Sequence, residues 1–178
     1  MDYLLLQDFL VTYSLPTLIV AVIVSTVSLT LNKFLVNAPK LLKAYLPFLL
    51  AVLLYFLYDM IFVEGAFLLN KHAFYGGILS GSLSVIISSA LRKISSGKSI
   101  GVSATALLIE GILDGYIANH LLTKTALDIE LALSIKDGEQ KEQQVIDTIS
   151  YNCSSLSSDQ IIRLAKLIIS AVKHVNKT

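Results

Sequence analysis

The sequence is poor in cysteine and in charge. Cys153 is the only cysteine among 178 residues, so no disulfide can form within the chain, and its Ser- and Asn-rich surroundings favour a plain buried thiol over a nucleophile. Charged residues make up 15% of the chain and leave a net charge of +1. Binding to nucleic acid needs a concentrated set of Lys and Arg, which is missing here. No nucleic-acid partner is expected.

Sequence motifs of catalysis are missing as well. The chain has no Gly-rich phosphate loop, no nucleophile elbow and no HExxH sequence. His72, His120 and His174 stand far apart without other metal ligands at suitable spacing. We therefore predict no enzymatic activity, no cofactor and no metal site.

What the chain has instead is three long apolar stretches, at residues 15–31, 45–63 and 73–91. A transmembrane helix needs roughly 17 to 25 apolar residues to cross a hydrocarbon core about 30 Å thick. Between Ser14 and Leu91, only six residues are Lys, Asp or Glu. The pattern predicts an all-α integral membrane protein, with three transmembrane helices in a domain at residues 15–94 and the lipid bilayer as a partner.

The leader at residues 1–14 carries Asp2 and Asp8 but no Lys or Arg, which is unlike a cleaved signal peptide. Running it into the first apolar stretch would give a helix of about 43 Å, longer than the bilayer is thick, and Pro16 offers a break. An interfacial helix along the membrane surface is favoured, with a tilted extension of the first span as the alternative.

Basic residues predict the orientation in the cell membrane. Lys33, Lys40 and Lys43 follow the first span, and Arg92, Lys93 and Lys98 follow the third, whereas the other side shows only Lys71. Under the positive-inside rule, the N-terminus faces outward and the C-terminal part lies in the cytoplasm.

The second half, residues 100–178, reads as a small cytosolic helical bundle. Helices are predicted at residues 103–122, 124–135 and 139–151, and a fourth begins at Ser157, where Gln160 completes a capping-box pattern. Residues 101–122 could also form a fourth span. Glu110 and Asp114 would then mark a cation or proton path, but each acid costs about 2.5 to 3.5 kcal/mol at the bilayer centre. They are better explained as a solvated helix face.

The third stretch has a face of small residues. Gly76, Ser80, Ser84 and Ser88 recur every four residues, and Gly77 with Gly81 forms a GxxxG step beside them. Such a face lets two helix backbones approach closely. It predicts either packing against another span of the same chain, which is favoured, or an oligomer face.

Asp59 is the acidic residue inside a predicted span, four residues from its outer end. An anchor that reaches the headgroup region is favoured over a buried ion site. Together with Glu110 and Asp114, it completes the candidate polar or ion-binding residues.

Two functions follow from this layout. The three spans, the outward N-terminus and the charged cytoplasmic tail resemble the general layout of three-span phage holins, a likeness of topology without a shared motif. The resemblance implies a homo-oligomer that forms a channel or holin-like pore, regulated by the cytosolic helices. In the alternative, the spans are an anchor, and the cytosolic helices form a scaffold that docks a cytosolic protein partner.

Overall fold

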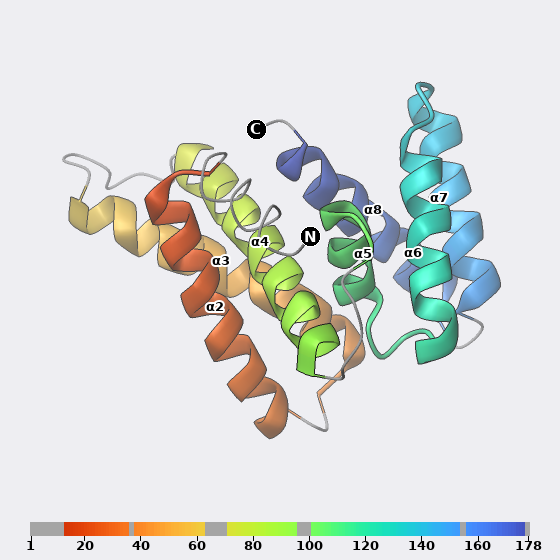
Figure 1. The fold of residues 1–178 in the computed structure, drawn as a ribbon. Helices are drawn as coiled ribbons and strands as arrows, with labels where there is room; N and C mark the ends of the chain where they lie inside the picture. The colour runs from red at the N-terminus through yellow and green to blue at the C-terminus, as the bar shows by residue number, and fades with distance from the viewer. Residues whose placement is uncertain (1–12, 36–37, 63–70, 96–100, 154–155, 177–178) are drawn as a thin grey trace.

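The computed structural model describes residues 13–35, 38–62, 71–95, 101–153 and 156–176 (Figure 1). This part of the chain forms helices without a β-strand, so the all-α prediction is confirmed. The helices are α2 (Leu15–Phe34), α3 (Lys40–Phe62), α4 (Lys71–Ser95), α5 (Ala104–Leu113), α6 (Asn119–Leu133), α7 (Gly138–Asn152) and α8 (Ser158–Val175). The predicted interfacial helix lies outside the described residues, apart from Tyr13 and Ser14. Lys98 and the side chains of Lys33 and His72 also lie outside them.

α3 and α4 are long and apolar enough to cross a membrane, and the apolar part of α2, Leu15–Leu31, is shorter. α3 begins at Lys40, so Pro47 lies inside the helix rather than in its first turn. Because proline has no N–H group, the carbonyl of Lys43 loses its usual helical hydrogen bond there. Membrane helices tolerate such a position when neighbouring groups compensate.

α4 is the central helix of the molecule. α2 and α3 pack against one side of it, and α5 and α8 pack against the other (Figure 1). α6 packs on α5, α7 packs on α8, and these two outer helices also contact each other. Residues 80–86 of α4 are consequently buried without interruption, which marks a helix covered on all sides.

α8 runs alongside α4 in the opposite direction. The hydroxyl of Tyr45, near the start of α3, donates a hydrogen bond to the carbonyl of Arg163 at 3.1 Å. Further along α8, the ring of His174 lies 5.4 Å from the ring of Tyr75, near the start of α4. His174 follows Arg163 by eleven residues, which is about 16 Å of helix, so α8 covers a large part of α4.

The helix predicted at residues 103–122 is wrong in its extent. α5 ends at Leu113, residues 114–118 turn, and α6 begins at Asn119. Gly115 has a φ of +79°, a conformation that a residue with a side chain rarely adopts. At ten residues and about 15 Å, α5 is too short to span a bilayer in this conformation. It is instead buried almost all round, between α4, α6 and α8.

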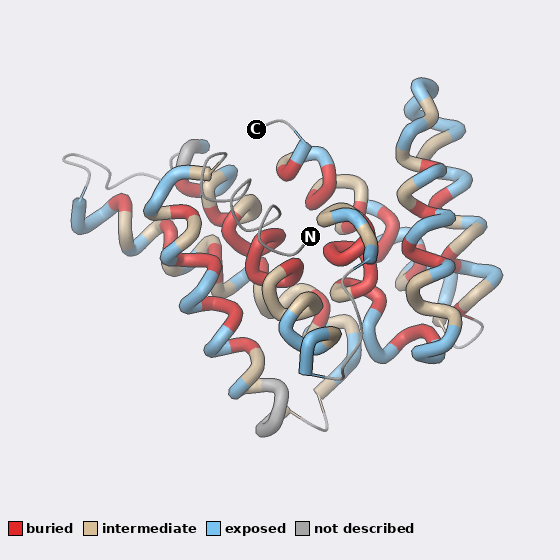
Figure 2. The backbone as a smooth tube through the Cα atoms, in the orientation of Figure 1, coloured by how far each residue is buried: buried red, intermediate tan, exposed pale blue. Residues whose placement is uncertain are grey.

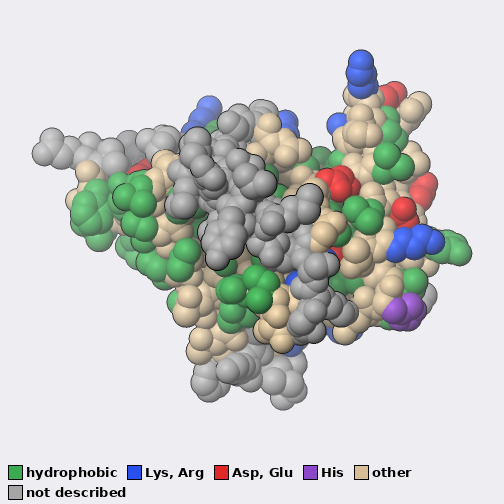
Figure 3. Space-filling view, viewed as in Figure 1, with side chains coloured by type: hydrophobic (Ala, Val, Ile, Leu, Met, Phe, Trp, Pro, Cys, Tyr) green, Lys and Arg blue, Asp and Glu red, His purple; other side chains and the backbone are tan. Residues whose placement is uncertain are grey.

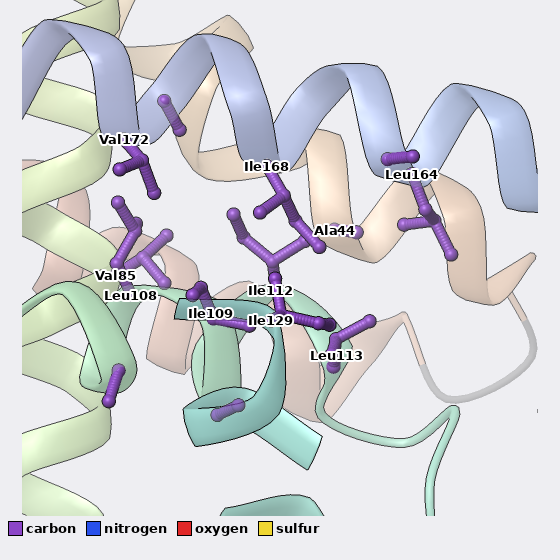
Figure 4. Packing of buried hydrophobic residues seen from close by; sticks show 14 of the residues in the cluster. Ala44, Val85, Leu108, Ile109, Ile112, Leu113, Ile129, Leu164, Ile168 and Val172 are labelled. Carbon is purple, nitrogen blue, oxygen red and sulfur yellow. The ribbon is translucent and has the colours of Figure 1, made fainter. Parts of the chain in front are cut away.

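One hydrophobic cluster joins the two halves of the chain (Figure 4). Ala44 of α3 and Val85 of α4 belong to the same cluster as Ile112 of α5 and Ile168 of α8. Figure 2 shows this buried zone running through the centre of the molecule. The division into domains at residues 15–94 and 100–178 stays a prediction, but in this conformation the two parts share one core.

Candidate functional site

The outer sides of α2 and α3 form an extended apolar surface. Its exposed residues, called here the outer apolar surface, are Leu15, Ile19, Val22, Ile23 and Val27 of α2 and Leu42, Leu49, Leu53, Leu57, Met60, Ile61 and Phe62 of α3. Figure 3 shows hydrophobic side chains gathered on this side of the molecule. An apolar patch of this extent marks contact with a membrane or with another protein.

The opposite side of the molecule is charged. The exposed residues of α6, α7 and α8 include Lys124, Asp128, Glu139, Asp147 and Lys166. In Figure 3, most of the Asp and Glu side chains in view lie on this side, with hydrophobic side chains among them. The two sides therefore differ: the outer apolar surface consists of apolar residues, whereas charged residues lie among exposed apolar ones, such as Leu131 and Tyr151, on the other side.

The small-residue face of α4 packs against α3 of the same chain. A Cβ atom on Gly77 would lie 2.5 Å from the Cα atom of Val52, and one on Gly81 would lie 2.9 Å from the Cα atom of Phe48. A Cβ atom on Gly76 would lie 2.5 Å from the ring of Tyr55. The glycines therefore let the two helix backbones approach, and in this conformation they are not available to a second copy.

The serines of this face are buried as well. The hydroxyl of Ser88 lies 2.8 Å from that of Ser25 of α2, within hydrogen-bond distance. Ser80 and Ser84 are fully buried, and neither hydroxyl has a hydrogen-bond partner among the described residues. A seam of hydroxyl groups thus lies inside the α2, α3 and α4 layer.

Asp59 lies on the inner face of α3, in register with Phe48, Ala51 and Tyr55. It is 2% exposed. Its position on the helix therefore points it into the molecule, rather than outward as the favoured anchor interpretation requires. The physical reason is its spacing, because residue 59 follows Tyr55 by one helical turn and shares its buried side.

Glu110 and Asp114 do not form a solvated face. Glu110 is buried, and its carboxylate lies 2.8 Å from the ammonium of Lys93. Asp114 forms an ion pair with Arg92 on a more exposed part of the surface. The last turns of α4 and the end of α5 are thus joined by two adjacent ion pairs, called here the charged junction.

The charged junction could have been sought in the sequence. Arg92 and Lys93 are neighbours, and the two acids lie about 20 residues later in the sequence. This spacing alone did not show that α5 folds back on α4.

Gly111 was not predicted as a functional or packing residue. A Cβ atom there would collide with the side chain of Val85, so this glycine permits the close crossing of the two helices.

The surroundings of Cys153 do not activate its thiol. Cys153 is buried, and this burial raises the pKa of its thiol, although Lys40 lowers it in part. A raised pKa leaves the thiol protonated and a poor nucleophile. Within the described ranges, no group of three His, Cys, Asp or Glu residues could hold a metal ion.

A groove lies between α6 and α7 on the charged side, with a volume of about 780 Å³. Tyr151 is 90% exposed at this groove and Leu131 is 72% exposed. Its remaining lining is polar and includes Gln143, Gln144 and Asp147. Tyrosine is one of the side chains in which protein-docking surfaces are enriched.

No protein-family model, no curated protein and no solved structure matches this chain.

Proposed function

We propose that the protein is a membrane anchor and scaffold, held at the bilayer through the outer apolar surface and presenting α6, α7 and α8 to a cytosolic protein partner. The observation that carries this proposal is the two-sidedness of the molecule, with exposed apolar residues on α2 and α3 and charged residues on the far side. Lipid is the medium that an uncharged surface of this extent fits best.

The packed conformation limits how this surface meets the bilayer. α8 lies along α4, and its exposed Lys166 and Arg163 would be carried to membrane depth if α4 crossed the bilayer with α8 still attached. Each such residue costs roughly 2.5 to 3.5 kcal/mol near the bilayer centre. The packed conformation therefore suits contact through α2 and α3, and a three-span arrangement requires α5 and α8 to leave α4.

The cytoplasmic orientation remains part of the proposal. Lys43 of α3 and Arg92 of α4 line one small cavity, so these basic residues lie at the same end of the helix layer. In the three-span arrangement, this end is the one that the positive-inside rule assigns to the cytoplasm. The partner is proposed to dock at the groove between α6 and α7.

Flotation with liposomes tests the membrane contact. The double substitution Leu49→Lys and Leu53→Lys places two charges on the outer apolar surface, where both residues are exposed and their loss disturbs no core. We expect this variant to lose most of its flotation and to keep its helical circular dichroism. Leu127→Lys with Leu131→Lys, two exposed residues four apart on α6, is the matched control and should float normally. Equal flotation of both variants would contradict the proposal.

The docking groove has its own test. A photo-cross-linking amino acid in place of Tyr151 should give one discrete adduct in intact cells, while the same amino acid in place of Lys136, an exposed loop residue outside the groove, should not. Tyr151→Ala combined with a cross-linker at Gln144 should reduce the yield at least tenfold. Adducts of equal yield at residues 136 and 151 would argue against a specific partner.

A self-assembling pore is the second candidate, and the buried hydroxyl seam favours it. The hydroxyls of Ser28, Ser80 and Ser84 have no hydrogen-bond partner within the described part of the chain, and such buried groups cost about 1 to 3 kcal/mol each. Rearrangement into an oligomer with a wet lumen would satisfy them. Ion leak from liposomes, together with the oligomeric mass in native-like lipid, tests this function, and a monomer without leak would exclude it.

A further inference from the structure

A second cavity, of about 1070 Å³, lies where the starts of α2 and α4 meet the second half of α8. Its described lining residues come from α2, α3, α4, α7 and α8 and from the two residues before α2. The volume lies just above the usual range for small-molecule sites, roughly 300 to 1000 Å³. This cavity is separate from the outer apolar surface and from the groove between α6 and α7.

One wall of the cavity is apolar and mostly aromatic. Phe74 and Tyr75 of α4 are each about half exposed at its edge, and Tyr55 is buried behind them. Leu79 and Ile78 continue this wall along α4. An alkyl chain lying along this wall would remove the aromatic rings from water, which is favourable in proportion to the area covered.

The opposite wall carries positive charge. Lys166 and Lys173 lie two turns apart on α8, with Ile169 between them, and all three line the cavity. The Nδ1 atom of His174 donates a hydrogen bond to the carbonyl of Ser170 at 2.7 Å, which leaves Nε2 as the ring nitrogen that can meet a ligand. Among the lining residues that the structure describes, Glu142 is the one acidic residue. The two lysines outweigh it.

We propose that this cavity binds a long-chain fatty acid, with the alkyl chain along the wall formed by Phe74, Tyr75 and Leu79 and the carboxylate beside Lys173. The combination of walls selects this class of ligand. A small inorganic anion would leave the aromatic wall wet, and a neutral alcohol of equal length would leave the lysines without a counter-charge.

Photo-cross-linking with a diazirine derivative of palmitate tests the proposal on the full-length protein in discs of zwitterionic lipid. Mass spectrometry of the cross-linked peptides should place the label on residues 74–79 and 166–174. An excess of palmitate should reduce the labelling at least tenfold, whereas hexadecanol should not. Label confined to α2 and α3 would show lipid contact only and would overturn the proposal, as would equal competition by hexadecanol.

Two lysine variants complete the test. Lys166→Gln with Lys173→Gln alters two exposed side chains, so the fold should be kept, and the labelling should fall about tenfold. Lys136→Gln removes an exposed lysine outside the cavity and should leave the labelling unchanged. Unchanged labelling of the double variant would overturn the role of α8. The double variant should still float with liposomes. A loss of labelling then reports a loss of fatty-acid binding and not a loss of membrane contact.

Discussion

The ammonium of Lys93 lies 2.8 Å from a carboxylate oxygen of Glu110, and both side chains are largely buried. Removing one member of a buried ion pair leaves the other charge uncompensated. We expect Glu110→Gln to lower the free energy of unfolding by about 3 to 5 kcal/mol. Chemical denaturation followed by far-UV circular dichroism measures the change.

The neighbouring ion pair supplies the control. Arg92 and Asp114 keep 48% and 37% of their side chains exposed, so water and salt screen their attraction. Asp114→Asn should therefore lower the free energy of unfolding by less than about 1 kcal/mol. Replacing both buried charges, Lys93→Met with Glu110→Leu, should recover most of the stability. A double variant as unstable as Glu110→Gln would contradict the assignment.

Close approach of α3 and α4 predicts a large effect at Gly77. Gly77→Ala would place a methyl group 2.5 Å from the Cα atom of Val52, and only separation of the two helices can relieve the overlap. We expect a loss of about 1 to 3 kcal/mol or more in stability, seen as a lower thermal midpoint. Gly138→Ala, where no atom lies within 4 Å, should leave the midpoint unchanged or raise it slightly.

Two buried acids predict a loss of stability at alkaline pH. Burial raises the pKa of the Tyr116 phenol, with further increases from Tyr45 and Cys153, and burial also raises the pKa of the Cys153 thiol. The unfolded chain therefore releases these protons first. Stability should be constant below the ordinary thiol pKa and should fall as pH rises through about 8.5 to 11, by up to about 1.4 kcal/mol per pH unit for each group.

Thermal midpoints across this pH range measure the effect. The double variant Cys153→Ala with Tyr116→Phe should show a flatter alkaline decline than the unsubstituted protein. The same steepness in both proteins would assign the decline to other groups.

Contact between Tyr75 and His174 allows α4 and α8 to be joined. In a Cys153→Ala background, Tyr75→Cys with His174→Cys can be bridged by a short thiol cross-linker, because the two native rings lie 5.4 Å apart. If three spans form only after α8 leaves α4, the bridged protein can contact the bilayer only through its surface. It should then still float with liposomes, but urea should release it from them. The single-cysteine variants, treated identically, should resist urea. Urea-resistant insertion of the bridged protein would show that separation is not required.

Predictions that depend on residues close together in the sequence were confirmed. Ser157 and Gln160 form the predicted capping box at the start of α8, because capping depends on residues within one turn. The apolar stretches also became helices. Asp59 and Glu110 were predicted to face the headgroup region and the solvent, but both are buried inside the molecule. Which side of a helix is buried depends on which other helix lies against it.

Sequence alone determined the helical class, the apolar character of the first half and the starts of α5, α7 and α8, because composition and periodicity act over short distances along the chain. Tertiary structure decided that Gly77 and Gly81 serve α3 of the same chain, that Lys93 meets Glu110, and that α8 covers α4. These relationships join residues far apart in sequence. They follow from how the helices fold back on one another, which no local pattern specifies.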